Sequence, residues 1–91
     1  MCYTNEQKAL IGGVIGSHFM GRNISQSLRD SFAQAYAHLQ TDKLSAADLR
    51  RIESALAFLT PQTCPTCNKE GYRDMIEALM ATRLMLREVS A

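Results

Sequence analysis

Three helix-start signals constrain this chain more than any other feature, because each is followed by apolar residues at spacings of three and four. Each signal pairs a residue that can cap a helix with a polar partner three positions later: Thr4 with Gln7, Asn23 with Gln26, and Ser45 with Asp48. Such pairs satisfy backbone N–H groups that a helix start leaves without partners. No segment alternates as a strand does. The pattern predicts one all-α domain, residues 1–91, of four antiparallel helices at roughly 5–20, 24–40, 46–59 and 69–89.

The apolar stripes predict which side of each helix is buried. The third helix carries Leu49, Ile52, Leu56 and Leu59, and the fourth is expected to turn inward Tyr72, Ile76, Leu79, Met80 and Leu86. Short connections join the first three helices, whereas about nine residues with both prolines and two cysteines precede the last one. A longer loop is where function most easily resides.

Charge and composition exclude several classes of protein. The 91 residues carry a net charge of +1, without the basic excess of a dedicated nucleic-acid binder, so nucleic acid is an unlikely partner. The first 22 residues have neither a basic start nor an apolar run long enough for a signal peptide or a membrane span. Three cysteines, an odd number, argue against a secreted disulfide scaffold. We therefore expect a cytoplasmic protein with no membrane partner.

The stretch "CPTCN" is the chemically reactive part of the sequence. Cys64 and Cys67 have the spacing at which two thiolates can chelate one zinc ion, and Asn68 can adopt the left-handed conformation that follows the second cysteine of many zinc knuckles. His18 is the expected third ligand, because the end of the first helix should lie near this loop. Water, Glu70 or a second subunit would complete the site. Cys2 and His38 are expected at the opposite end.

Two other interpretations of this loop stay open. A thiol–disulfide redox function favours Cys64 at a helix start with Pro65 as the first helical residue, since a helix N-terminus stabilises a thiolate. Gly71 opposes that placement, because the glycine would then lie inside the first two turns. The third interpretation is a plain loop with two reduced thiols.

Three glycines in the first helix, Gly12, Gly13 and Gly16, call for an explanation in packing. Each costs about 0.8 to 1 kcal/mol relative to alanine in a helix interior. Small residues on adjacent turns allow another helix to approach closely. The partner is expected to be either a neighbouring helix of the same chain or a second copy, which would make a homodimer.

For function, the sequence predicts a non-enzymatic protein, because no general acid, base or nucleophile has a visible partner set. We expect a small helical regulator, adaptor or inhibitor of the kind that phages and accessory genes encode, which binds another protein. The expected surface is Met80, Arg83 and Arg87 of the last helix, where two like charges at i, i+4 favour an acidic partner. The alternatives are redox or zinc chemistry at the CPTC loop, and a nucleic-acid-associated regulator.

Overall fold

The structure, a computed structural model, describes residues 2–20 and 23–90, except for the side chains of His18, Met20 and Ser90. It consists of helices joined by short segments, and no strand occurs within the described ranges. The elements in chain order are α1 (Asn5–Val14), the π-helix η1 (Ile15–Met20), α2 (Gln26–Gln40), α3 (Ala46–Leu59), the 3₁₀ turn η2 (Thr60–Gln62) and α4 (Lys69–Ser90). The predicted all-α, four-helix fold is confirmed.

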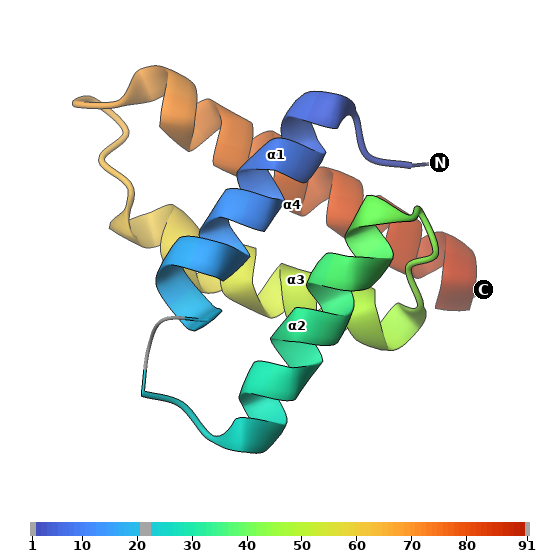
Figure 1. Cartoon of the computed structure of the whole chain (residues 1–91). Helices are drawn as coiled ribbons and strands as arrows, with labels where there is room; N and C mark the ends of the chain where they lie inside the picture. The colour runs from blue at the N-terminus through green and yellow to red at the C-terminus, as the bar shows by residue number, and fades with distance from the viewer. Residues whose placement is uncertain (1, 21–22, 91) are drawn as a thin grey trace.

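The helices form two crossed pairs. In Figure 1, α1 and α2 run in opposite directions and lie in front of α3 and α4, which also run in opposite directions. The Cα atoms extend over 33 × 33 × 20 Å, the flat shape of two helical layers. The antiparallel arrangement therefore holds within each pair, while the first pair lies across the second. No helix in the described part of the chain is both long and apolar enough to cross a membrane.

Two of the three predicted start signals are confirmed. Capping boxes form at Thr4 with Gln7 and at Ser45 with Asp48. The third was wrong by two residues, because Ser25, and not Asn23, caps α2 by accepting the Leu28 N–H at 3.2 Å. The Gln26 amide, which was expected to complete a box with Asn23, instead donates to Asp30 at 2.8 Å.

The first predicted helix ends at Met20, as expected, but it changes from an α-helix to a π-helix along its length. After Val14 the backbone continues as η1, a π-helix, so residues 5–20 are not one regular α-helix. The wider turns contain Gly16 and place the Phe19 ring on Phe32 of α2, with centroids 4.6 Å apart. Insertion of a π turn shifts the register of the side chains that follow it. The aromatic stack thus gives the end of this helix its contact with α2.

The core confirms the predicted face of α3 and corrects that of α4. All four predicted α3 residues are buried, whereas α4 buries Met75, Ala78, Leu79, Ala81, Thr82 and Met85. Of the five residues expected inside α4, only Leu79 is buried, Tyr72, Ile76 and Leu86 are partly buried, and Met80 is 58% exposed. The prediction followed the large apolar side chains. The buried side of α4 includes the small residues Ala78, Ala81 and Thr82, which a ranking by hydrophobicity does not select.

Tyr3 adds a polar contact to this core. Its side chain is buried, and its hydroxyl is hydrogen-bonded to Thr82 of α4. The Thr82 hydroxyl donates its only proton to the Ala78 carbonyl at 2.8 Å, so Tyr3 must be the donor to Thr82. Burial raises the pKa of Tyr3 from 10.0 to about 12, since the ionised phenol would lose its hydration.

This pKa predicts a loss of stability in alkali. Because the folded pKa lies above the unfolded one, the contribution of Tyr3 is complete below about pH 10 and disappears as the pH rises toward 12. Two pKa units correspond to about 3 kcal/mol. Urea unfolding followed by circular dichroism should show a steeper decline above pH 10 for the native chain than for Tyr3→Phe. Parallel curves for the two proteins would contradict the assignment.

Candidate functional sites

The segment from Thr60 to Asn68 crosses from α3 to α4 and holds the two cysteines. After η2, Thr63 leaves the helical conformation, although its hydroxyl still donates to the Leu59 carbonyl at 3.2 Å. Pro61 lies in η2, where a proline fits the first turn of a helix. The chain then makes a second turn, in which the Asn68 N–H donates to the Cys64 carbonyl at 3.1 Å. These bonds hold the loop as two consecutive turns.

Cys64 and Cys67 lie side by side in the second turn. Their Cα atoms are 5.2 Å apart, and the structure pairs the two sulfurs as a disulfide. The Cys67 N–H points at the Cys64 sulfur at 3.0 Å, and the Thr66 hydroxyl lies 3.5 Å from the same sulfur. Cys67 is exposed and Cys64 is partly buried. The predicted proximity of the two cysteines is present.

Asn68 begins α4 and corrects two expectations. Its side-chain oxygen accepts the Gly71 N–H at 3.1 Å, and its carbonyl accepts the Tyr72 N–H at 3.0 Å, as at a helix N-cap. Among the non-glycine residues described, only Asp42 has a positive φ, so Asn68 does not adopt the left-handed form of a zinc knuckle. The helix begins after both cysteines, so Cys64 is not at its start and Pro65 is not its first residue.

Gly71 is required by this cap. A Cβ atom at position 71 would overlap the Asn68 side-chain amide, which lies directly against the glycine. The sequence interpretation took Gly71 only as an argument against a helix start at Pro65. The start at Lys69 puts the glycine in the first turn, where it leaves room for the capping side chain.

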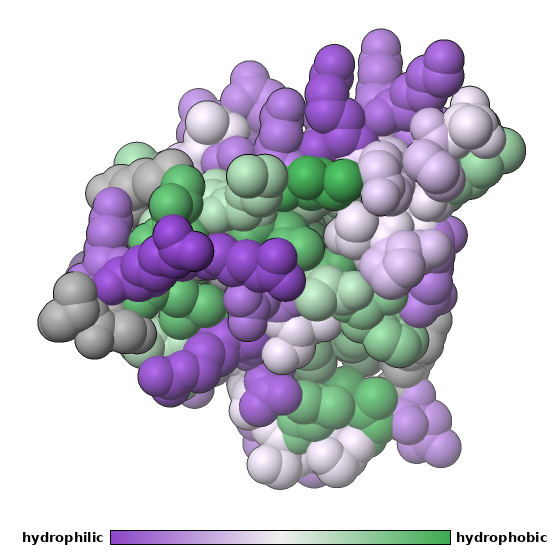
Figure 2. Space-filling view, turned by 180° about the vertical axis from the view of Figure 1, so that it is seen from behind, coloured by the Kyte–Doolittle hydropathy of each residue, from purple (hydrophilic) through white to green (hydrophobic). Residues whose placement is uncertain are grey.

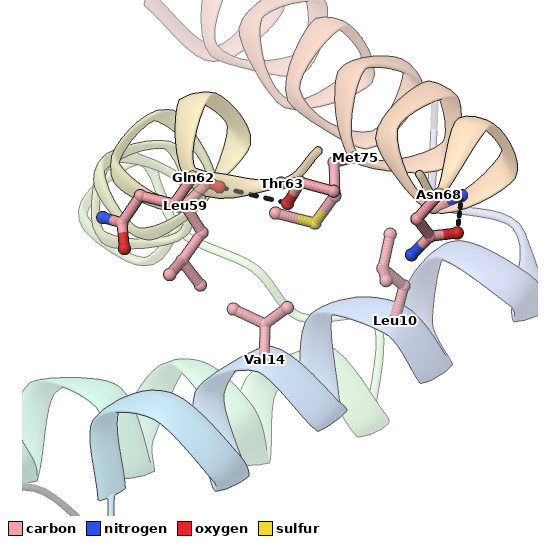
Figure 3. A pocket seen from close by; sticks show the side chains of 8 residues that line it. Leu10, Val14, Leu59, Gln62, Thr63, Asn68 and Met75 are labelled. Carbon is pink, nitrogen blue, oxygen red and sulfur yellow. Dashed lines mark hydrogen bonds between the residues drawn. The ribbon is translucent and has the colours of Figure 1, made fainter. Parts of the chain in front are cut away.

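A hollow of about 370 Å³ lies beside this loop, between α1 and the start of α4. Figure 3 shows Leu10 and Val14 of α1 facing Leu59 and Met75 across it, with Thr63 and Asn68 at its edge. Thr63 and Asn68 are the residues just before Cys64 and just after Cys67. An apolar hollow with a polar edge therefore borders the cysteine turn.

The expected zinc ligands are brought together only in part. Cys64 and Cys67 are adjacent, but the side chain of His18, the expected third ligand, lies outside the described residues. Within the described part of the chain, no three His, Cys, Asp or Glu side chains gather closely enough to hold a metal ion. Cys2 lies far from the loop, in a hollow with Val89 near the end of α4. That placement agrees with the expectation for Cys2.

His38 also lies away from the loop, in a contact that sequence reasoning missed. Its Nδ1 atom is 2.6 Å from Asp48 Oδ2, which joins the end of α2 to the start of α3. Burial would raise the pKa of the Asp48 carboxyl, but hydrogen bonds from the Ser45 N–H and from His38 outweigh burial and hold this pKa below its ordinary value. The contact gives His38 a structural role.

The second candidate site is a shallow hollow of about 260 Å³ on the outer face of α4. It is lined by Met80, Arg83, Leu84 and Arg87, so the three predicted partner-binding residues lie together. Leu84, 44% exposed, was not predicted, although its position four residues after Met80 could have indicated it. Figure 2 shows apolar patches on the outer side of α3 and α4, with hydrophilic side chains lying across them.

The two arginines of this hollow differ in their surroundings. Arg83 Nε lies 3.2 Å from Glu53 Oε2 of α3, so its charge has a partner within the chain. Arg87 forms no ion pair with any other residue that the structure describes. The sequence analysis did not indicate Glu53, which is 30 residues from Arg83.

Comparison with known proteins gives no relative from which a function could be inferred. No family model, no curated protein and no solved structure matches this chain. The candidate sites therefore depend on their own geometry.

The Asn68 cap predicts that, of two glycine-to-alanine changes, one stabilises the protein and the other has little net effect. Gly13→Ala meets no atom within 4 Å and should stabilise the helix by up to about 1 kcal/mol, the difference in helix propensity. Gly71→Ala gains the same propensity but displaces the Asn68 side chain, and loss of a cap costs about 1 kcal/mol. Urea unfolding of both variants measures the difference. Equal stabilisation would show that the cap does not depend on Gly71.

Zinc binding stays a prediction for the reduced protein. Thiolates are the form in which cysteine binds zinc, so Cys64 and Cys67 can act as ligands only after their disulfide is reduced. Elemental analysis of protein purified with a reductant and without added metal should find zinc near one equivalent. The Cys64→Ser variant should lose it, and His18→Ala should weaken it. Zinc content equal in the native chain and Cys64→Ser would refute the assignment.

Proposed function

We propose that this protein acts by binding another protein through the outer face of α4, as a regulator, adaptor or inhibitor and not as an enzyme. The single observation that supports the proposal is that two exposed apolar side chains, Met80 and Leu84, line one hollow together with Arg83 and Arg87. Methionine adapts its shape to a partner, and arginine is enriched at the centres of protein interfaces.

The chemistry of this face indicates what the partner offers. Arg87 has no ion pair among the described residues, so its charge can pair with a carboxylate of the partner. Arg83 can exchange Glu53 for an external carboxylate at a small cost, because their ion pair is exposed. A complementary surface would carry an apolar side chain for the hollow and an acidic group beside it. A helix of the partner would suit such a surface, since its anchors recur at three- and four-residue spacing.

The proposal includes the compartment, the cytoplasm, because an odd number of cysteines disfavours a secreted disulfide scaffold. A nucleic-acid partner is the weaker alternative, because the net charge is only +1. The conformation of the α3–α4 connection also disfavours a helix-turn-helix. That motif joins its helices by three or four residues, and here Thr60 to Asn68 intervene.

Binding through this face predicts a charge-dependent partner. The native chain, used as bait in an extract of its host, should retain one protein in stoichiometric amount. Arg83→Glu/Arg87→Glu should lose it, because reversed charges repel an acidic surface and like charges in contact cost several kcal/mol. Arg73→Glu, an exposed change on the same helix outside the hollow, and Cys64→Ser should both retain it.

The circular dichroism spectrum and melting temperature of the double variant should match those of Arg73→Glu, so that a lost partner reflects the surface and not the fold. Retention of the same protein by all variants would move the binding site away from α4.

Self-association through the glycine face of α1 is a second proposal about partners. Gly12 packs within the chain, since a Cβ atom there would lie 3.2 Å from the Tyr36 ring of α2. Gly13 and Gly16 face open space, and Gly16 lines a hollow with Ala33 and the half-exposed Tyr36. This smooth face could receive a second copy around a two-fold axis.

A homodimer on this face predicts a concentration-dependent mass. Light scattering should give twice the chain mass of 10.1 kDa at high concentration and the monomer mass after dilution. Gly16→Leu, which fills the hollow, should stay monomeric, while the α4 variant Arg73→Glu should dimerise like the native chain. A mass near 10.1 kDa over the whole range would exclude the dimer.

A further inference from the structure

The cysteine turn is organised in a way that partner binding through α4 does not use. Disulfides span Cα–Cα distances of about 4.4 to 6.8 Å, and the 5.2 Å between Cys64 and Cys67 falls within this range. The bond can therefore form and break without movement of the backbone. Both residues belong to one turn, closed by the backbone hydrogen bond from the Asn68 N–H to the Cys64 carbonyl, which involves neither sulfur.

The two sulfurs have different surroundings. The Cys64 sulfur accepts the Cys67 N–H at 3.0 Å and lies 3.5 Å from the Thr66 hydroxyl, two donors that stabilise negative charge on it. The Cys67 side chain is exposed, and the residue before the pair, Thr63, and the residue after it, Asn68, border an open hollow. The Cys64 sulfur therefore has donors that stabilise a thiolate, whereas the Cys67 sulfur is exposed to an external thiol.

We propose that Cys64 and Cys67 form a reversible dithiol–disulfide couple that exchanges with low-molecular-weight thiols and disulfides. The asymmetry of the turn gives the order of the steps. It differs from the arrangement expected from the sequence, because the charge on Cys64 is stabilised by donors of its own turn and not by the start of α4.

Reduction takes place in two exchanges. An external thiolate attacks the Cys67 sulfur, the bond between the two cysteines breaks, and its electron pair goes to Cys64, whose charge the Cys67 N–H stabilises. A second external thiolate attacks the external sulfur of the mixed disulfide and releases Cys67 as a thiolate. Each thiolate takes up the proton that its external thiol gave up. The protein gains two electrons and two protons, and two thiols become one disulfide.

The experiment uses the Cys2→Ser chain, because Cys2 is exposed and would react as well. The protein is equilibrated with reduced and oxidised glutathione at a series of ratios, with a chelator present so that metal cannot protect the thiols. It is then quenched with a maleimide and weighed by mass spectrometry. We expect two labels at the reducing end, none at the oxidising end, and one two-electron transition between them.

The mixed disulfide trapped early in reduction tests which sulfur is attacked. Acid quenching of the oxidised Cys2→Ser chain soon after glutathione is added, followed by peptide mass spectrometry, should place the glutathione on Cys67. Cys2→Ser/Cys64→Ser and Cys2→Ser/Cys67→Ser, which hold one cysteine each, should take up one glutathione at most and give the reference masses for the two positions. Circular dichroism confirms that each variant is folded.

Two outcomes would overturn the proposal. One is a protein that takes two labels at every ratio, and the other is a protein that ends with two bound glutathiones and no internal bond. Trapped glutathione found mainly on Cys64 would refute the assignment of Cys67 as the attacked sulfur.

Discussion

The packing of α3 against α4 is the constraint on which the rest of the molecule depends. It is the most extensive contact between any two described elements. The leucine and isoleucine stripe of α3 lies in one core with Met75, Ala78, Leu79, Ala81 and Met85 of α4. This choice of inner face turns Met80 and Leu84 outward, where they line the hollow with the two arginines. The candidate binding surface is thus a consequence of how α4 is oriented by its core.

The features that the sequence predicted well are those determined by local interactions. Capping boxes act over three residues, so the start of α3 after Ser45 could be predicted from the sequence. The end of α3 was also predicted, although Thr60 before Pro61 keeps α-region angles and begins a 3₁₀ turn. The features that the sequence did not predict depend on contacts between residues far apart in the chain. The Tyr3–Thr82 hydrogen bond joins residues 79 positions apart. The inner face of α4 depends on the shape of α3, which hydrophobicity alone does not reveal.

In the candidate sites too, contacts within one turn could be predicted from the sequence, whereas contacts between helices could not. That Cys64 and Cys67 meet follows from their spacing, because one turn brings residues three apart together. The role of Asn68 was misjudged, since a capping asparagine and a left-handed asparagine have the same sequence signal after a cysteine. The Glu53 partner of Arg83 depends on the crossing of α3 and α4. His38 faces Asp48 for a similar reason, as the two residues lie on different helices.

Both proposed activities involve α4, yet they are separable. The cysteine turn immediately precedes Lys69, and at 1.5 Å per residue Met80 lies roughly 16 Å further along the helix and Arg87 roughly 27 Å. Changes this far apart, without shared contacts, have effects that usually add. The cap of α4, formed by the Asn68 side chain and the Gly71 N–H, involves neither cysteine sulfur. The redox chemistry of the loop therefore has no need of the partner surface, nor the partner surface of the loop.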